Sequence, residues 1–113
     1  MDIKIFHNSR CGTSRTTLGL LRDAGHEPEV IDYLAQPPAR AQLRDMIARA
    51  GLSVREAVRS KEALYGELGL DGADDEALLD AMVANPILIN RPFVVTPKGV
   101  RLCRPSDLVN EIL

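Results

Sequence analysis

Residues 2–33, DIKIFHNSRCGTSRTTLGLLRDAGHEPEVIDY, contain the pattern that decides the fold. Apolar and polar residues alternate over residues 2–6, which indicates a strand. A polar loop over residues 8–14 follows, and apolar residues at helical spacing then run to Gly25, a typical helix stop. Residues 29–33 have the composition of a second strand. A strand, a helix and a strand within about thirty residues predict a right-handed βαβ unit with parallel strands.

The middle of the chain carries helical signals. A helix opens at Pro37-Pro38, has apolar residues at positions i, i+3, i+4 and i+7, and ends at Gly51. The capping-box sequence over residues 53–56 predicts a short helix that carries residues 58–59. The acidic run over residues 74–76 begins another helix, since carboxylates favour the positive end of a helix. We therefore expect a helical insertion here.

Strand signals return near the end of the chain. Residues 93–96 and 100–103 flank the turn Pro97-Lys98-Gly99, which is typical of an antiparallel hairpin. Ser106 is expected to cap a last short helix. Together with the βαβ unit, this order predicts an α/β fold with a mixed four-stranded sheet, in one domain spanning residues 1–113.

Length and charge limit the function classes. The 113 residues suffice for one core, and the net charge of −2 argues against a general nucleic-acid or membrane surface. The sequence starts directly with strand-like alternation, without the apolar core of a secretory signal, and no apolar run has the length of a membrane span. We therefore expect a cytoplasmic protein whose two cysteines are reduced.

Cys11 is the candidate nucleophile. It lies in the polar loop before a predicted helix, where unpaired backbone N–H groups and the helix dipole favour the thiolate. Arg10 and Arg15 add positive potential. The polar and glycine neighbours argue against the alternative, a buried structural cysteine. Cys103, in contrast, lies in an apolar strand and is interpreted as a core residue.

Ser14 and His7 flank this candidate. Ser14 occupies the position of the second cysteine in a C-x-x-C motif, so the site cannot close a local disulfide, and a mixed disulfide with an outside thiol is the natural intermediate. The Ser14 hydroxyl could hydrogen-bond the Cys11 thiolate or cap the helix. His7 could stabilise the thiolate as an imidazolium, or order the loop as a neutral ring.

The loop around Cys11 is also suited to hold an oxyanion, because backbone N–H groups at a helix start bind anions. Arginines from elsewhere must supply the remaining charge, since forked guanidinium groups match a tetrahedral oxyanion. Arg91 precedes Pro92 at a strand start, and this X-Pro bond is a candidate cis bond. Arg104 precedes Pro105 before a helix start. The alternative for each is a solvated loop arginine. The cysteines and histidines lack metal-ligand spacing, so no metal site is expected.

Three stretches make the chain recognisable. They are HNSRCGTSR at residues 7–15, YL at 33–34 followed by PP at 37–38, and NPILINRPFVVTP at 85–97, which continues to Gly99 and to RLCRPS at 101–106. On these stretches the chain closely resembles the glutaredoxin-dependent arsenate reductases of bacteria, over nearly its whole length. The second and third stretches together are far more specific than a lone cysteine motif.

The resemblance implies a thioredoxin-like fold with a helical insertion and the reduction of arsenate to arsenite. It implies that the Cys11 thiolate attacks arsenate to form a thiol–arsenate ester, that glutathione is a co-substrate, and that no cofactor is bound. Glutaredoxin is the implied protein partner, which resolves the glutathionylated cysteine. The family's oxyanion-binding arginines correspond to Arg59, Arg91 and Arg104. Its thiolate-tuning residues correspond to His7 and Ser14.

Two other functions remain open. RNA-polymerase-binding redox regulators share the fold and a similar ending, but they often carry a full C-x-x-C switch, which Ser14 interrupts here. A glutathione-dependent thiol reductase without a role in arsenate chemistry would use the same Cys11. An assay of arsenate turnover with glutathione and glutaredoxin separates these alternatives.

Overall fold

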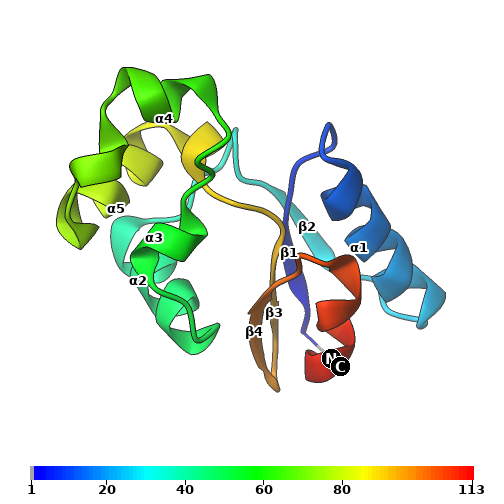
Figure 1. Cartoon of the computed structure of the whole chain (residues 1–113). Coiled ribbons are helices and arrows are strands. Elements are labelled where there is room, and N and C mark those ends of the chain that lie inside the picture. Colours follow the sequence, from blue (N-terminus) through cyan, green and yellow to red (C-terminus); the bar gives the residue numbers. More distant parts are fainter. Residues whose placement is uncertain (1) are drawn as a thin grey trace. The chain divides into compact units, whose positions relative to one another are not determined.

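The computed structural model describes residues 2–113, which fold into two compact units. Unit 1 contains the residues up to Gln36 together with Arg91–Leu113, and unit 2 contains Pro37–Asn90. Figure 1 shows the strands in unit 1 and the succession of helices in unit 2. None of the helices among the described residues combines the length and the apolarity that crossing a bilayer requires. The expectation of one domain over residues 1–113 stays a prediction.

Unit 1 is built on a mixed sheet with the strand order β2-β1-β3-β4. Its strands are β1 (Lys4–His7), β2 (Glu29–Asp32), β3 (Phe93–Thr96) and β4 (Gly99–Leu102). β1 pairs in parallel with β2, and β3 pairs antiparallel with both β1 and β4. The structure thus confirms the predicted βαβ unit, the hairpin and the mixed four-stranded sheet of a thioredoxin-like fold.

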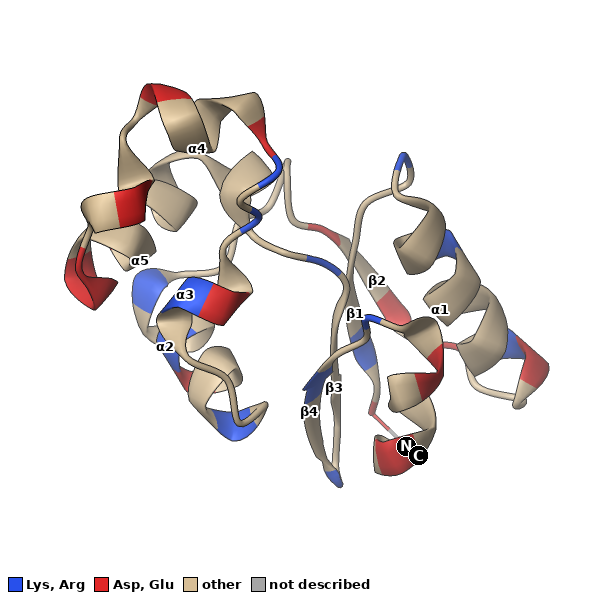
Figure 2. Cartoon of the chain, viewed as in Figure 1, with Lys and Arg blue, Asp and Glu red and all other residues tan. Residues whose placement is uncertain are grey.

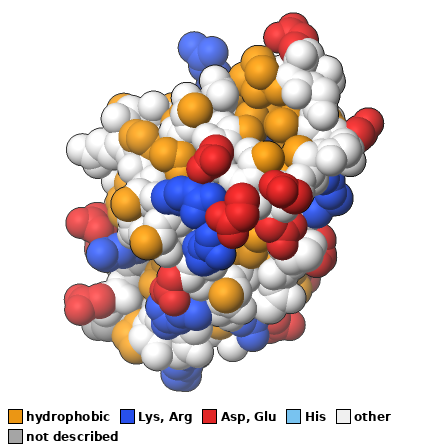
Figure 3. Space-filling model, turned by 90° about the vertical axis from the view of Figure 1, so that its left-hand side faces the viewer, with side chains coloured by type: hydrophobic (Ala, Val, Ile, Leu, Met, Phe, Trp, Pro, Cys, Tyr) orange, Lys and Arg blue, Asp and Glu red, His pale blue; other side chains and the backbone are white. Residues whose placement is uncertain are grey.

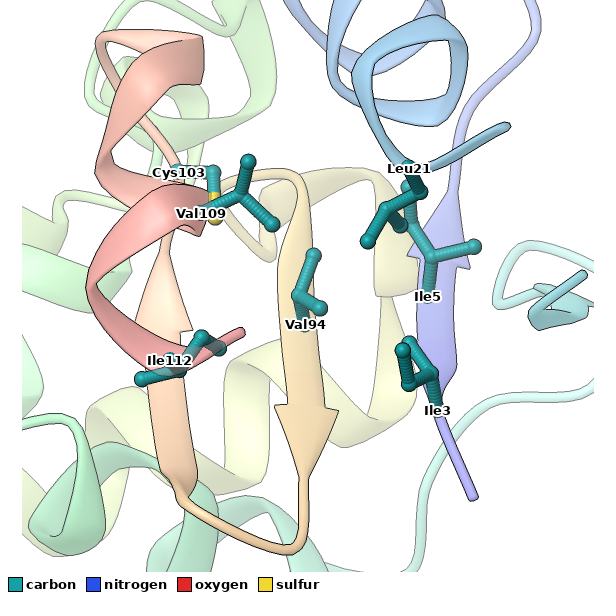
Figure 4. Packing of buried hydrophobic residues seen from close by; sticks show 7 residues of the cluster. All are labelled: Ile3, Ile5, Leu21, Val94, Cys103, Val109 and Ile112. Atoms are coloured by element: carbon teal, nitrogen blue, oxygen red, sulfur yellow. The ribbon is translucent and has the colours of Figure 1, made fainter. Parts of the chain in front are cut away.

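The core of unit 1 lies between the sheet and two helices, α1 (Gly12–Asp23) and the 3₁₀ helix η3 (Ser106–Ile112), which pack against each other (Figure 4). The buried residues of this cluster are Ile3, Ile5, Leu21, Val94, Cys103, Val109 and Ile112. Full burial of such aliphatic side chains stabilises the fold by roughly 1.5–3 kcal/mol each. This packing holds the start of α1 close to the end of β1, and so positions the loop that joins them.

The predicted ends of the two helices of unit 1 can be compared with the structure. α1 stops before Gly25, whose φ of +89° suits glycine, as predicted. Ser106, expected to cap the last helix, does not do so, because the N-cap residue is Pro105 and no side chain caps this helix. The Ser106 hydroxyl instead donates to the Thr13 carbonyl oxygen at 3.1 Å. This bond ties the beginning of η3 to the first turn of α1.

Unit 2 is helical, as predicted. Its elements are α2 (Arg40–Arg49), α3 (Val54–Ala57), α4 (Ala63–Glu67), the 3₁₀ helix η1 (Leu70–Gly72), α5 (Asp75–Ala84) and the 3₁₀ helix η2 (Pro86–Leu88). α2 begins at Arg40, after Pro37-Pro38 rather than at them, because Ala39 is extended, with φ −63° and ψ 154°. α5 begins where the acidic run predicts, with Asp74 accepting from the Ala77 N–H at 2.9 Å. The sequence patterns do not predict α4.

The short helix expected to carry Val58 and Arg59 ends earlier. The capping box forms as predicted, but Val58 is extended and makes an isolated β-bridge with Ile89. The Arg59 N–H donates to the Leu88 carbonyl oxygen at 2.8 Å. Backbone groups that would continue the helix are thus satisfied by a segment distant in the sequence. The prediction that these two residues are helical is wrong.

An ion cluster joins α2 to α5 on the surface of unit 2. Arg40 pairs with Glu76 and donates through Nε to Asp80 at 2.7 Å. Arg44 donates to both carboxylate oxygens of Glu76, at 2.7 and 2.8 Å. Hydrogen bonds from Arg44, and next from Arg40, lower the pKa of Glu76 from 4.5 to about 2. Figure 2 shows basic residues on α2 and acidic residues on α5, and Figure 3 shows opposite charges side by side on one face.

Candidate active site

Cys11 lies between β1 and α1, at the N-cap position of the helix. Its backbone is extended, with φ −93° and ψ 120°, and its N–H donates to the Asn8 carbonyl oxygen at 3.0 Å, so the chain turns tightly just before the helix. The Cys11 carbonyl accepts from the Arg15 N–H as the helix begins. The side chain is partly exposed. The predicted nucleophile therefore stands at the positive end of α1, within reach of solvent.

The pKa of the Cys11 thiol lies below its ordinary value. Burial is the largest single influence and opposes ionisation, but hydrogen bonds to the sulfur together outweigh it. In order of size, these come from the Ser14 N–H, the Arg104 guanidinium, the Thr13 N–H and the Arg91 guanidinium. Because an anionic sulfur accepts such bonds better than a neutral thiol does, they favour the thiolate.

Two of the candidate arginines lie beside Cys11 in unit 1. Arg104 Nη1 lies 3.7 Å from the Cys11 Sγ and also donates to the Arg91 carbonyl oxygen at 3.0 Å. Arg91 is buried, at 7% exposure, and stands just before β3. The peptide bonds Arg91–Pro92 and Arg104–Pro105 are both cis, the first as predicted. The start of β3 and the end of β4 thus bring two guanidinium groups to one thiol.

His7 and Ser14 contact each other within the same loop. His7 Nδ1 lies 2.6 Å from the Ser14 Oγ, and this buried hydroxyl also accepts from the Asn8 N–H at 3.0 Å. Burial, followed by the positive charge of Arg22, lowers the pKa of His7, which favours the neutral ring. A neutral ring is the second of the two alternatives for His7, in which the side chain orders the loop. The contacts of the Ser14 hydroxyl thus differ from the two that we expected, a bond to Cys11 or a helix cap.

Arg59 and Cys103 are each described by their own surroundings. Arg59 belongs to unit 2, where its Nε lies 3.6 Å from the Glu62 Oε1. Cys103 is fully buried, which confirms its place in the core, and burial raises the pKa of its thiol to about 12. Residues 2–113 contain no group of three or more His, Cys, Asp or Glu that could hold a metal ion. Of the two cysteines, Cys11 alone has the position of a nucleophile.

The sequence matches the model of the ArsC family over residues 6–112, a range that includes the Cys11 loop and all three candidate arginines. The chain belongs to the ArsC family. Relatives named arsenate reductase from Rhizobium meliloti (strain 1021) and Escherichia coli (strain K12) are 58% and 54% identical to it. The matches cover 100% and 99% of this chain, and 82% and 81% of the relatives.

A solved structure supports the same assignment. The structure of an arsenate reductase from Vibrio cholerae is 43% identical, with a TM-score of 0.95, and the match covers 100% of this chain and 98% of that one. The mixed four-stranded sheet and the helical insertion of this chain are therefore those of a solved structure that carries the arsenate reductase name, consistent with the ArsC family.

The sequence patterns do not single out Asn8, a residue of the Cys11 loop. Asn8 appears in the sequence only as one of several polar loop residues, yet its side chain bonds the Arg10 N–H at 2.9 Å and the Tyr33 hydroxyl at 3.2 Å. A signal was available for the first bond, since an Asn side chain commonly accepts from the N–H two residues further on. No local pattern indicates the second, because Tyr33 is 25 positions away.

Proposed function

We propose that this chain is an arsenate reductase, which reduces arsenate to arsenite through a Cys11 thiol–arsenate intermediate. The observation that carries the proposal is the 3.7 Å distance between the Cys11 Sγ and the Arg104 Nη1, at a helix start where the pKa of the thiol is lowered. A thiolate beside a forked cation can receive an oxyanion and attack its central atom. The name arsenate reductase, carried by a relative at 58% identity, supports the same reaction.

The reaction begins when the Cys11 thiolate attacks arsenic. An S–As bond forms, and one arsenate oxygen leaves as water after taking up protons. Arg91 and Arg104 hold the remaining oxygens and offset their charge. A glutathione thiolate then attacks the Cys11 sulfur, so that an S–S bond forms while the S–As bond breaks. The electron pair of that bond reduces As(V) to As(III), and the products are arsenite and a Cys11–glutathione mixed disulfide.

Recovery of the thiol requires an outside reductant, because Ser14 stands where a resolving cysteine would be. A glutaredoxin thiol attacks the glutathione sulfur of the mixed disulfide and releases the Cys11 thiolate. Glutathione is thus the co-substrate and glutaredoxin the protein partner, and the reaction needs no bound cofactor. We assign it to the cytoplasm, where the glutathione pool is reduced.

The remaining roles follow from contacts and from family correspondence. His7 and Ser14 tune the thiolate indirectly, by ordering the Cys11 loop, and the 2.6 Å contact between their side chains supports this role. Arg59 is the third oxyanion-binding arginine, which the correspondence to the family supports.

The test is arsenate-dependent oxidation of NADPH in the presence of glutathione, glutathione reductase and glutaredoxin. We expect turnover that requires arsenate and glutaredoxin and that disappears in Cys11→Ser. A low-molecular-weight disulfide, supplied in place of arsenate, is the comparison substrate. Turnover of the disulfide without turnover of arsenate would overturn the proposal in favour of a glutathione-dependent thiol reductase.

A further inference from the structure

Asn8 is a polar residue with 4% exposure that makes three hydrogen bonds within the Cys11 loop and one to Tyr33. Its backbone N–H donates to the Ser14 Oγ at 3.0 Å, and its carbonyl accepts from the Cys11 N–H at 3.0 Å. Its side-chain Oδ1 accepts from the Arg10 N–H at 2.9 Å, and its Nδ2 donates to the Tyr33 hydroxyl at 3.2 Å. The backbone and the side chain of Asn8 thus both hold the turn that leads to Cys11.

The two side-chain bonds fix the amide in one orientation. A backbone N–H can only donate, so Oδ1 must face Arg10, and the amide nitrogen is left to face Tyr33. Tyr33 is 1% exposed and directly follows β2, so its hydroxyl is a fixed point supplied by the sheet. A buried amide that is bonded through both its oxygen and its nitrogen resists rotation, because turning it would break both bonds. Asn8 therefore connects the loop rigidly to the strand beside it.

The position of this loop decides what the Cys11 sulfur faces. Cys11 is the N-cap residue of α1, so its side chain stands at the first N–H groups of the helix, and those of Thr13 and Ser14 help to lower the pKa of the thiol. Hydrogen bonds weaken steeply as their angle departs from linearity, so a small rotation of the turn before Cys11 would cost the thiolate part of its stabilisation. Asn8 is not among the residues whose hydrogen bonds to the sulfur favour the thiolate. Any effect of Asn8 on the thiol therefore passes through the conformation of the loop.

We propose that Asn8, held by Tyr33, is a positioning residue for Cys11, which shapes the turn over residues 8–11 so that the sulfur faces the first N–H groups of α1. The inference rests on the proposed function for the role of Cys11 as nucleophile. Its consequence is measured on the thiol itself, without arsenate.

The experiment compares Asn8→Ala, Tyr33→Phe and the double variant with the parent chain. The readout is the rate of iodoacetamide alkylation against pH, followed at Cys11 by peptide mass spectrometry, together with the melting temperature. In Asn8→Ala we expect the midpoint of the alkylation profile to rise by about one pH unit, because the sulfur loses part of its hydrogen bonding. Tyr33→Phe should raise it less. The double variant should not exceed Asn8→Ala, since both changes break the same connection.

Thr96→Val is the matched control. Thr96 is also buried, at 2% exposure, and its hydroxyl donates to the Ile112 carbonyl oxygen at 2.6 Å, at the opposite end of β3 from the site. This variant should lower the melting temperature and leave the alkylation midpoint unchanged. If Asn8→Ala and Tyr33→Phe behave like Thr96→Val, the role of Asn8 is structural and the inference is wrong. If Asn8→Ala fails to fold, the alkylation midpoint of Tyr33→Phe, which keeps the aromatic ring, provides the test. A raised midpoint supports the inference, and an unchanged midpoint contradicts it.

Arsenate turnover separates this inference from the proposed function. In Asn8→Ala, turnover should fall at neutral pH and recover as the pH is raised through the shifted midpoint, whereas a purely structural loss would not recover. A parent chain without arsenate turnover would overturn the proposed function, while a raised alkylation midpoint in Asn8→Ala would still support the inference. If the parent chain turns over arsenate normally but the alkylation midpoint does not move in Asn8→Ala or Tyr33→Phe, the inference about Asn8 is wrong and the proposed function stands.

Discussion

Arg104 Nη1 lies 3.7 Å from the Cys11 Sγ, although 93 positions separate the two residues in the sequence. The same nitrogen donates to the Arg91 carbonyl oxygen at 3.0 Å, which holds the guanidinium beside the thiol. Cys11 follows β1 and Arg104 follows β4, so the cation reaches the sulfur by way of the sheet. One thiol thereby combines a helix start with a forked cation.

We expect Arg91→Lys and Arg104→Lys each to lower kcat/KM for arsenate more than tenfold, a loss on the order of 2 kcal/mol. Lysine keeps the positive charge but cannot give two parallel hydrogen bonds to an oxyanion. Sulfate should protect Cys11 from alkylation in the parent chain and protect it less in either variant.

Arg101→Lys is the control for these variants, because Arg101 pairs with Glu111 at 3.0 Å on the surface of unit 1. It should keep nearly full turnover. Full arsenate activity in both Arg91→Lys and Arg104→Lys would mean that these arginines are ordinary loop residues, and the thiol-reductase alternative would gain.

Substitution by serine should affect arsenate turnover differently at the two cysteines. Cys11→Ser should abolish turnover, because the hydroxyl is a far weaker nucleophile than the thiolate. Cys103→Ser should keep most of the turnover and lose stability of about 1–3 kcal/mol, since it places a hydroxyl in an apolar core. Urea unfolding measures the second effect. A folded Cys103→Ser protein without activity would contradict the single-thiol mechanism.

The lowered pKa of Cys11 sets the direction of its pH dependence. Because the thiolate is the stabilised form, it persists at pH values where an ordinary thiol is protonated, and alkylation should slow only when the pH falls through the lowered pKa. The urea-unfolded chain supplies the reference, with a midpoint near the ordinary value of about 8.5. A folded-state midpoint at or above this reference would show that the site does not activate the thiol.

The ion cluster of unit 2 predicts a pH-dependent contribution to stability. The pKa of Glu76 is about 2 in the folded chain against 4.5 as its ordinary value, so the carboxylate stabilises the fold fully above pH 4.5 and loses this effect as the pH falls toward 2. Glu76→Gln should therefore lower the urea midpoint slightly at pH 7, and the difference from the parent should narrow below pH 4.5. Salt should also narrow it, since these groups are exposed.

Glu67→Gln is the control, because it removes an exposed carboxylate of the same unit that lies outside the cluster. A larger loss of stability in Glu67→Gln than in Glu76→Gln at pH 7 would mean that net charge, rather than the bonds to Arg40 and Arg44, determines the effect.

The strands and the longer helices could be predicted because their signals are local. Alternation indicates β1, and the acidic run with its N-cap Asp74 indicates α5. The end of α3 could not be predicted, since Val58 leaves the helix to pair with Ile89. That choice depends on a hydrogen-bonding partner which no local pattern reveals.

The same distinction applies to the candidate site. Cys11 could be singled out because its position before a helix is visible in a short stretch of sequence. The closeness of Arg104 follows from the register of three paired strands, and only the family resemblance indicated it in advance. The bond between Asn8 and Tyr33 depends on the parallel pairing of β1 with β2, so it became visible only with the fold.

The strand order has a consequence for the newly made chain. β1 comes first in the sequence but lies inside the sheet, between β2 and β3. Because Cys11 and α1 precede Arg91 and Arg104 in the sequence, they are synthesised first. Until β3 and β4 pair with β1, the two guanidinium groups that hydrogen-bond the sulfur in the folded chain are not held beside it. The complete environment of Cys11 therefore requires both ends of the sequence, since it joins residues from β1 and from the β3–β4 hairpin.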